Sequence, residues 1–405
     1  MEAREEEQIP GGKKRRKIIG ILFVLLIVIC ILAGGMIRYA GKDRKPSQEN
    51  IGRLLENVAA NAGEDYRIAV AAEELWPELV QQFGEERFVK TGSNHPGGEA
   101  RRLGAEFLIM AGSLEDEEAD NTGYTLLEQD GSYTLYGSSL KPGEWKITQR
   151  GTVSGLQSMA YSLVSEDGKL ILLDGGHPED ADACSRLAEL FGNRVDLWIC
   201  SHFHDDHIGA VIRILEENPR VEVGEIWCPP MDAESYRSFA KEWDCIESCE
   251  SFLKLIENRE NVYRIRGGDD REFAGLKFHF LSSYDPEMAW THEGNNCGFI
   301  FRIMGNSETM LFCCDIGNDW ISEVLMKWQS DYLKADYVQM GHHGNGGLSE
   351  EAYRKTAPKA AFFDAPGWLF EDEEKYLAQK NRKLMESMGC TIYLLDDAPN
   401  CIILK

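Results

Sequence analysis

The spacing of apolar and polar residues changes its character near residue 144 of this chain of 405 residues. In residues 51–143, helical spacing is mixed with short apolar runs, and "YTLLEQDGSYTLYG" is two alternating runs joined at an Asp-Gly pair, which predicts a β-hairpin. In residues 144–405, apolar runs such as "VDLWIC" alternate regularly with helical stretches such as "DADACSRLAELFG". The pattern predicts a small mixed α/β region without a chemical motif, followed by an α/β sheet with polar loops along the carboxyl ends of its strands.

One segment is apolar without interruption. Residues 18–37, "IIGILFVLLIVICILAGGMI", hold 20 consecutive residues without a charge, and at a rise of 1.5 Å per residue they span about 30 Å, the thickness of a bilayer core. The basic stretch "KKRRK" precedes this segment, which by the positive-inside rule places the amino terminus in the cytoplasm. A cleaved signal peptide is the alternative, although its apolar core is normally shorter. We therefore expect a cytoplasmic tail at 1–17, a single-pass membrane anchor at 18–37, a linker at 38–50, and the remainder outside the cell.

The net charge of residues 46–405 limits the partners that they can bind. Residues 46–405 hold 33 Lys and Arg against 63 Asp and Glu, a net charge of −30. Because binding of nucleic-acid phosphates needs clusters of Lys and Arg, a nucleic-acid partner is disfavoured without being excluded, and we expect a small-molecule or cell-envelope substrate. The sequence names no protein partner. Ten of the 11 cysteines follow the anchor, which suits an exported protein only in a reducing or oxygen-free habitat.

A dense group of metal-binding residue types follows the run "VDLWIC". The stretch "SHFHDDHIGA" places His202, His204, Asp206 and His207 within six positions. His202 and His204 project to the same side of an extended chain, whereas Asp206 and His207 fall in the turn into the next helix. Two directions of ligation from one loop suit two adjacent metal ions. Imidazole together with carboxylate suits zinc, with manganese or iron as alternatives.

The pattern His-x-His-x-Asp-His after an apolar strand resembles the metallo-β-lactamase superfamily. Three further stretches resemble the other motifs of that family in order: "LILLDGG" with Asp174, "TMLFCCDIG" with Asp315, and "YVQMGHHGNGG" with His342 and His343. The resemblance covers residues 144–405 and implies an αββα sandwich of two sheets flanked by helices. The His-His-Gly ending together with "GNNCGFIFRI" is most similar to the ComEC-like branch, and the choline-phosphate esterases of bacterial surfaces are a looser comparison.

The resemblance also implies a ligand set for one or two divalent metal ions. The first ion would be held by His202, His204 and Asn295, the second by Asp206, His207 and His342, with Asp315 bridging the two. Asn295 stands where many members of the family carry histidine, as it tends to in the ComEC-like branch, and His292 is the alternative ligand. An amide oxygen binds zinc more weakly than imidazole does, so a single bound ion is compatible with this set.

Three residues are candidates for a role beyond simple ligation. The resemblance implies that Asp174 orients the metal-binding loop through hydrogen bonds and that Asp206 belongs to the catalytic set. His342 is preferred over His343 as a ligand because it comes first after the strand, and His343 would then donate to a substrate oxygen. Adjacent side chains of an extended chain point in opposite directions, so the reverse assignment stays open.

The function expected from these residues is that of a membrane-anchored, metal-dependent hydrolase. A hydroxide generated by the metal ions near neutral pH would attack the substrate, with a phosphoester as the favoured substrate class. One alternative is a lactone, β-lactam or thioester hydrolase of the same fold. Another is a sensory or partner-binding ectodomain that binds metal without turnover.

Overall fold

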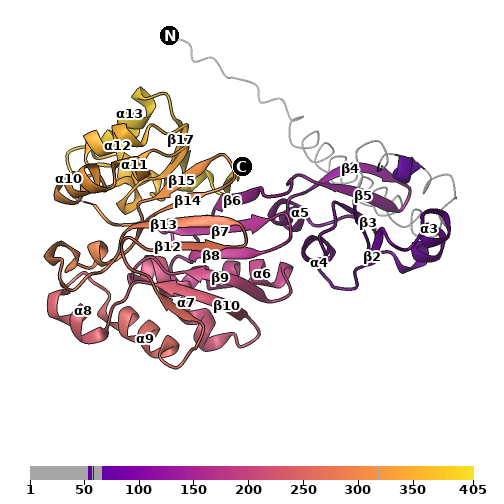
Figure 1. Ribbon diagram of the computed structural model, residues 1–405, viewed down its shortest axis with the longest axis horizontal. Helices are drawn as coiled ribbons and strands as arrows, with labels where there is room; N and C mark the ends of the chain where they lie inside the picture. Colours follow the sequence, from indigo (N-terminus) through magenta and orange to yellow (C-terminus); the bar gives the residue numbers. More distant parts are fainter. Residues whose placement is uncertain (1–52, 57, 59–65, 318) are drawn as a thin grey trace, which may run out of the picture.

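The computed structural model of the chain describes residues 53–56, 58, 66–317 and 319–405 (Figure 1). The predicted cytoplasmic tail, membrane anchor and linker lie outside this part of the chain. Within it, no helix combines the length and the apolar character needed to cross a membrane. The anchor and the orientation of the chain across a membrane therefore stay predictions.

The first region is built on a five-stranded sheet in the order β2-β1-β3-β5-β4. Strands β4 and β5 run antiparallel on either side of the Asp-Gly pair, which confirms the predicted hairpin. Apolar side chains on the two faces of this sheet form two small cores with the neighbouring helices. The elements of this region are β1 (Ile68–Val70), η1 (Glu73–Leu75), α3 (Trp76–Phe83), β2 (Phe88–Lys90), α4 (Pro96–Arg102), β3 (Phe107–Ala111), α5 (Asp116–Thr122), β4 (Tyr124–Asp130) and β5 (Tyr133–Ser138).

The second region contains two seven-stranded sheets. The first has the order β11-β10-β9-β8-β7-β6-β19 and the second the order β12-β13-β14-β15-β16-β17-β18. The strands of the first sheet are β6 (Trp145–Gln149), β7 (Ala160–Ser165), β8 (Leu170–Asp174), β9 (Arg194–Ile199), β10 (Glu222–Cys228), β11 (Val262–Arg264) and β19 (Asn400–Leu404). The strands of the second sheet are β12 (Asp270–Phe273), β13 (Leu276–Ser282), β14 (Ile300–Met304), β15 (Thr309–Phe312), β16 (Tyr337–Gln339), β17 (Ala360–Phe363) and β18 (Thr391–Leu394).

Helices cover the outer face of each sheet (Figure 1). The first sheet packs under α6 (Ala181–Leu190), α7 (Asp205–Glu217), α8 (Ala233–Phe239) and α9 (Ile246–Ile256). The second packs under α10 (Asp319–Trp328), α11 (Ser330–Leu333), α12 (Glu350–Thr356) and α13 (Ala378–Ser387). This order of layers confirms the predicted α/β sandwich.

Each sheet is covered by helices on one face and by the other sheet on the opposite face. This explains why the strands are continuous apolar runs. In β8, Ile171 and Leu173 pack into the core between the two sheets, whereas Leu170 and Leu172 pack under the helices. Successive side chains of a strand point to opposite faces, so a strand with both faces covered needs apolar residues at every position. The last strand of the chain lies beside the first strand of this domain. Strand β19 pairs antiparallel with β6, with Leu404 opposite Trp145.

The first region contacts the second through α4, α5 and α6. Arg102 donates from Nε to the carbonyl oxygen of Phe191 over 2.8 Å, and its Nη2 lies 3.0 Å from Oδ2 of the buried Asp196. Lys146 on β6 lies 2.6 Å from Oδ1 of Asp120 on α5. These charged contacts across the boundary connect the small region to the flank of the larger domain.

Candidate metal centre

Four strand ends meet where the two sheets face one another. Strands β8 and β9 are parallel neighbours in the first sheet, and β15 and β16 are parallel neighbours in the second. Asp174 ends β8, the His202 to His207 segment follows β9, Asp315 follows β15, and the His342–His343 pair follows β16. Carboxyl ends of parallel strands share one edge of a sheet, so residues far apart in the sequence meet in one place.

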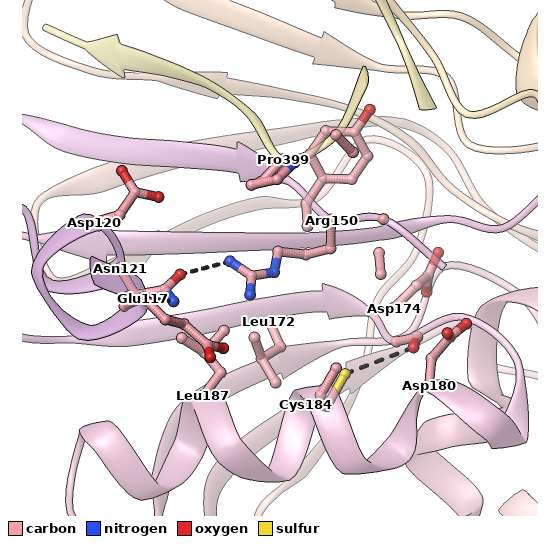
Figure 2. Close-up of a pocket in the computed structure, with 16 residues that line it drawn as sticks. Glu117, Asp120, Asn121, Arg150, Leu172, Asp174, Asp180, Cys184, Leu187 and Pro399 are labelled. Carbon is pink, nitrogen blue, oxygen red and sulfur yellow. Dashed lines mark hydrogen bonds between the residues drawn. The ribbon is translucent and has the colours of Figure 1, made fainter. Parts of the chain in front are cut away.

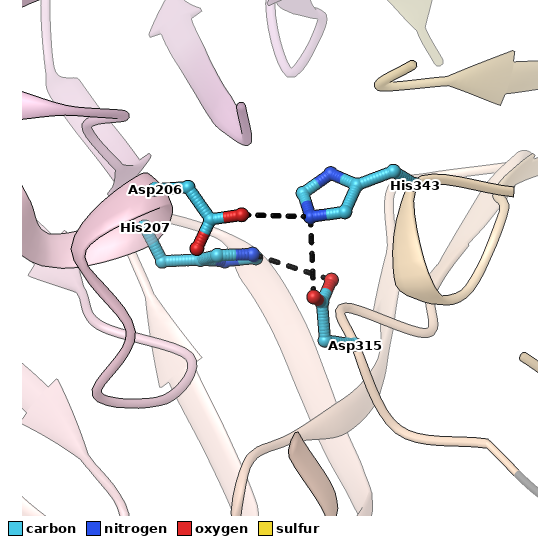
Figure 3. Close-up of side chains that lie close together, drawn as sticks. All are labelled: Asp206, His207, Asp315 and His343. Atoms are coloured by element: carbon cyan, nitrogen blue, oxygen red, sulfur yellow. Dashed lines mark ion pairs between the residues drawn. The ribbon is translucent and has the colours of Figure 1, made fainter. Parts of the chain in front are cut away.

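Asp206, His207, Asp315 and His343 form one buried cluster (Figure 3). Each offers one ligand atom, and these atoms all lie within 4.8 Å of one another. His343 Nε2 lies 3.1 Å from Asp206 Oδ2 and 3.2 Å from Asp315 Oδ2. His207 Nε2 lies 3.2 Å from Asp315 Oδ1. Two imidazoles and two carboxylates thus face a common point between the sheets.

The donor atoms of this cluster fit a divalent metal ion. His207 Nε2, His343 Nε2 and Asp315 Oδ1 are buried and have no hydrogen-bond partner, although they lie at ion-pair distance from one another. Buried polar atoms without hydrogen bonds are costly and therefore rare. Imidazole nitrogen and carboxylate oxygen are the ligands that zinc, iron and manganese take in proteins. A shared cation would satisfy all of these atoms at once.

The charges around His207 and His343 also favour a bound cation. Burial lowers the pKa of His207, but the carboxylates of Asp315, Asp174 and Asp206 outweigh burial and raise it well above its ordinary value. Burial likewise opposes the charged form of His343, yet Asp315 and Asp206 raise its pKa to about 10. The carboxylates therefore create a site that attracts positive charge. A divalent cation would compete there with the protons of the imidazoles.

Asp174 holds His207 from behind. Its Oδ2 lies 2.7 Å from His207 Nδ1, and its carboxylate accepts hydrogen bonds from the backbone N–H and the hydroxyl of Ser201 over 2.7 and 2.6 Å. With Nδ1 engaged in this way, Nε2 of His207 faces the cluster. A carboxylate behind a ligating imidazole fixes both the tautomer and the orientation of the ring.

The residues expected for a first metal ion lie beside this cluster. His202 is fully buried, its Nε2 has no hydrogen-bond partner, and this atom lies 4.0 Å from Asp315 Oδ2. The His202 ring centroid lies 4.8 Å from that of His204 and 4.0 Å from that of His207. Oδ1 of Asn295 is also buried without a partner. His202 and Asn295 thus each present an unsatisfied atom.

The structure places the two adjacent histidines differently from the order that the sequence favoured. His343 is buried in the cluster, whereas His342 lines the cleft above it, with Nε2 3.5 Å from Nδ2 of Asn295. The preference for His342 assumed an extended chain after β16. Instead, both histidines have a left-handed backbone, with φ of 51° and 57°, and this turn directs His343 toward the carboxylates. The geometry therefore favours His343 as the ligand.

His292, the alternative to Asn295, lies elsewhere. It is exposed, and its ring stacks on that of Phe239 with centroids 5.8 Å apart. The unsatisfied atom near the cluster is Oδ1 of Asn295 instead. The geometry therefore favours Asn295 of the two.

Sequence reasoning missed Asp244. Its Oδ1 lies 2.9 Å from His204 Nε2, and the carboxylate is buried. The backbone of Gly294 lies against this pair, since a Cβ there would lie 2.0 Å from Asp244 Oδ1 and 2.7 Å from His204 Nε2. Asp244 belongs to no motif of the sequence. Only the packing of the two loops reveals the contact.

A cleft of about 430 Å³ opens onto the centre. Its lining residues are Leu156, Gln157, His177, His204, Asp205, Asp206, Trp243, Cys245, Asn295, Asp315, His342 and Trp368. None of these is Lys or Arg, whereas Trp243 is 73% exposed and Trp368 39% exposed. The cleft thus offers aromatic surface and acidic groups, and no cationic side chain of its own.

Part of the chain matches a known family model. Residues 153–278 match the family model described as the metallo-beta-lactamase superfamily. Over 173 residues, the chain is 24% identical to ComE operon protein 3 of Bacillus subtilis (strain 168). That alignment covers 42% of this chain and 20% of the relative, so the chain spans about a fifth of the length of the relative that it matches.

Solved structures give more distant similarities. YhfI of Bacillus subtilis, a metallo-beta-lactamase fold protein, is 14% identical with a TM-score of 0.40, covering 64% of this chain and 99% of its own. CmlA of Streptomyces venezuelae, a diiron β-hydroxylase, is 14% identical with a TM-score of 0.41, covering 77% and 62%. Zinc-bound PqqB of Methylobacterium extorquens is 12% identical with a TM-score of 0.38, covering 64% and 99%.

Proposed function

We propose that this chain, which carries a domain of the metallo-β-lactamase superfamily, is a metal-dependent hydrolase that acts on a small phosphoester. The observation that carries the proposal is the buried cluster of Asp206, His207, Asp315 and His343, in which atoms of the last three residues have no hydrogen-bond partner. A purely structural cluster would satisfy these atoms within the protein.

The proposed ligand set follows the geometry. Asp206, His207 and His343 would hold one ion, His202, His204 and Asn295 would hold the other, and Asp315 reaches both groups. A divalent cation bound there supplies Lewis acidity, which makes water more acidic and stabilises negative charge developing on a substrate oxygen. The metal would be zinc, with manganese and iron as alternatives.

The chain's own residues orient these groups and receive the substrate. Asp174 fixes His207 through Nδ1, and Asp244 engages His204 through Nε2. His342 lines the cleft, where its imidazole would contact a substrate oxygen. In this assignment His342 takes the role that the sequence analysis gave to His343.

The charge of the cleft limits the substrate class. With no Lys or Arg in its lining, the cleft would leave the charge of a polynucleotide or polyphosphate largely uncompensated. A small phosphodiester carries a single negative charge, which the metal ions alone can neutralise. The same lack of cations favours a neutral ester such as a lactone as the second candidate.

A substrate panel on the purified full-length protein in detergent tests this proposal. We expect hydrolysis of bis(p-nitrophenyl) phosphate to exceed hydrolysis of p-nitrophenyl phosphate, dihydrocoumarin and nitrocefin. Asp315→Ala should reduce the rate to that of the uncatalysed reaction, because Asp315 reaches both groups of ligands. Faster hydrolysis of dihydrocoumarin would favour the lactone reading, and rapid, salt-sensitive degradation of long DNA would overturn the small-substrate proposal. Bound metal without any turnover would favour the sensory alternative.

We also propose that the chain is anchored in the cell membrane by residues 18–37, with the hydrolase domain outside. The support is the uncharged length of that segment and the basic stretch before it. Protease added to wall-stripped cells should then digest the hydrolase domain and leave a small amino-terminal fragment. Full protection of the domain would reverse the orientation.

A further inference from the structure

A second cavity, of about 360 Å³, lies between the small region and the hydrolase domain (Figure 2). Helix α5 of the small region forms one wall, and α6 and strands of the first sheet form the others. Its walls are apolar over most of their surface, with Leu172, Leu187 and Pro399 among the lining residues. None of the proposed metal ligands lines it.

One cationic side chain lies in this cavity. Arg150, directly after β6, reaches across it and donates from Nη1 to Oδ1 of Asn121 over 2.6 Å (Figure 2). Asn121 in turn donates to the carbonyl oxygen of Glu117 over 2.8 Å, which leaves its own amide oxygen for Arg150. Among the described residues, no carboxylate lies within ion-pair distance of the guanidinium. A neutral amide is thus its side-chain partner.

The acidic residues of the cavity have other partners or lie at its surface. Asp120 forms its ion pair with Lys146 at 2.6 Å. Asp180 accepts hydrogen bonds from the Thr152 hydroxyl and from the backbone N–H of Val153, each over 2.8 Å. Glu117 is exposed to solvent. Asp174, the fourth carboxylate of the lining, is engaged by His207 and Ser201. Glu117 and Asp120 act on Arg150 only from beyond ion-pair distance, so its guanidinium forms no direct ion pair in the cavity.

An anion in the cavity would give the guanidinium the ion pair that it lacks. Moving a charge out of water is unfavourable, and buried charges are normally paired. Burial lowers the pKa of Arg150, as expected for a desolvated cation. Arg150 as a whole residue is half-buried, and its side chain lines the cavity rather than packing into the core. Its remaining N–H groups are available to a ligand in that space.

We propose that this cavity binds a small monocarboxylate with a short apolar chain, with its carboxylate on Arg150. The planar guanidinium matches a carboxylate with two parallel hydrogen bonds, and the apolar walls suit a hydrocarbon chain of about six carbons. A dianion such as phosphate fits less well, because Glu117, Asp120, Asp174 and Asp180 also line the cavity and one guanidinium offsets only a single negative charge. This site is separate from the proposed hydrolytic function and does not rest on it.

A ligand in this cavity would contact a segment that also supports the metal centre. Asp174 and Gly175 form part of its wall, and the thiol of Cys184 donates to the carbonyl oxygen of Gly175 over 3.6 Å. The carboxylate of Asp174 holds His207 on the other side of this turn. The ligand would therefore contact the segment that orients a proposed metal ligand.

Calorimetric titration of the full-length protein in detergent, with hexanoate as the probe, tests the proposal. We expect saturable binding that strengthens from butanoate to hexanoate and is not seen with hexanamide, which lacks the charge. Arg150→Gln should weaken hexanoate binding about tenfold or more, because it removes a charge-assisted hydrogen bond. Circular dichroism checks that the variant is folded.

Ala183→Leu is the second variant. Ala183 lines the cavity and is partly exposed on α6, so a larger side chain there fills the space without disturbing the core. It should abolish the gain in affinity from butanoate to hexanoate while leaving Arg150 in place. The absence of binding for all the carboxylates would overturn the proposal. Equal affinities in wild type and Arg150→Gln would overturn it too.

Discussion

The two halves of the metal centre differ in the charge that their donor groups carry. In the half formed by Asp206, His207, Asp315 and His343, two carboxylates face two imidazoles, and His207 Nε2, His343 Nε2 and Asp315 Oδ1 have no hydrogen-bond partner. In the half expected from His202, His204 and Asn295, His204 already has a carboxylate partner in Asp244, and the other two donors are neutral.

This difference predicts unequal binding of two metal ions. The first half brings two carboxylates to a cation, which offset its double charge. The second half has no carboxylate ligand of its own. It shares Asp315 with the first half, and Asp315 Oδ2 lies 4.0 Å from His202 Nε2. Neutral ligands alone bind a divalent cation more weakly than ligands that carry charge. We therefore expect one tightly held ion and one that a chelator removes readily.

The largest effect should come from breaking the first half. His343→Ala should remove the tightly held ion and with it the activity, because it deletes one of the four converging donors. His342→Ala is the matched control from the neighbouring position. It should keep the metal while kcat falls by roughly 10² or more, if its imidazole acts on the substrate. Metal analysis by mass spectrometry and steady-state rates separate the two. Loss of metal only in His342→Ala would restore the order that the sequence favoured.

The fold could be predicted from the sequence because it depends on the pattern of apolar residues within short segments. The run from Leu170 to Leu173 is apolar at every position because both faces of β8 are covered, and such runs alternate with helical spacing. The metal-binding stretch was predictable for the same reason, since its four candidate ligands lie within six positions.

The rest of the site depends on tertiary packing. Whether His342 or His343 enters the cluster depends on a left-handed turn that no periodicity reveals. Asp244 reaches His204 from 40 residues away, through a loop whose sequence carries no motif. The residue types of the metal centre were thus predictable from the sequence. The left-handed turn and the loop contact with Asp244 were not.

A smaller effect should follow from weakening the support of the first half. Asp174→Asn keeps the volume, and asparagine tolerates the left-handed backbone at this position, where φ is 53°. The amide cannot accept all the hydrogen bonds that Ser201 and His207 now donate to the carboxylate. Loss of such support typically weakens metal binding 10- to 100-fold, which competition with a chromogenic chelator measures. Asp196→Asn, another buried carboxylate, should lower Tm and leave the metal affinity unchanged. Equal metal affinity in Asp174→Asn and wild type would contradict a positioning role.

The smallest effect should come from the second half. Asp244→Ala removes the partner of His204 Nε2, so the ring loses its preferred orientation, and we expect the loosely held ion to bind about tenfold more weakly while the tight ion stays. Titration with a chelator resolves the two ions. Asp232→Ala is the control, because this carboxylate caps α8 at the surface and accepts from Ser235 rather than from a histidine. A loss of the tight ion in Asp244→Ala would show that the two halves are not separable. Unchanged binding of both ions would reduce the Asp244 contact to a packing interaction of the loop.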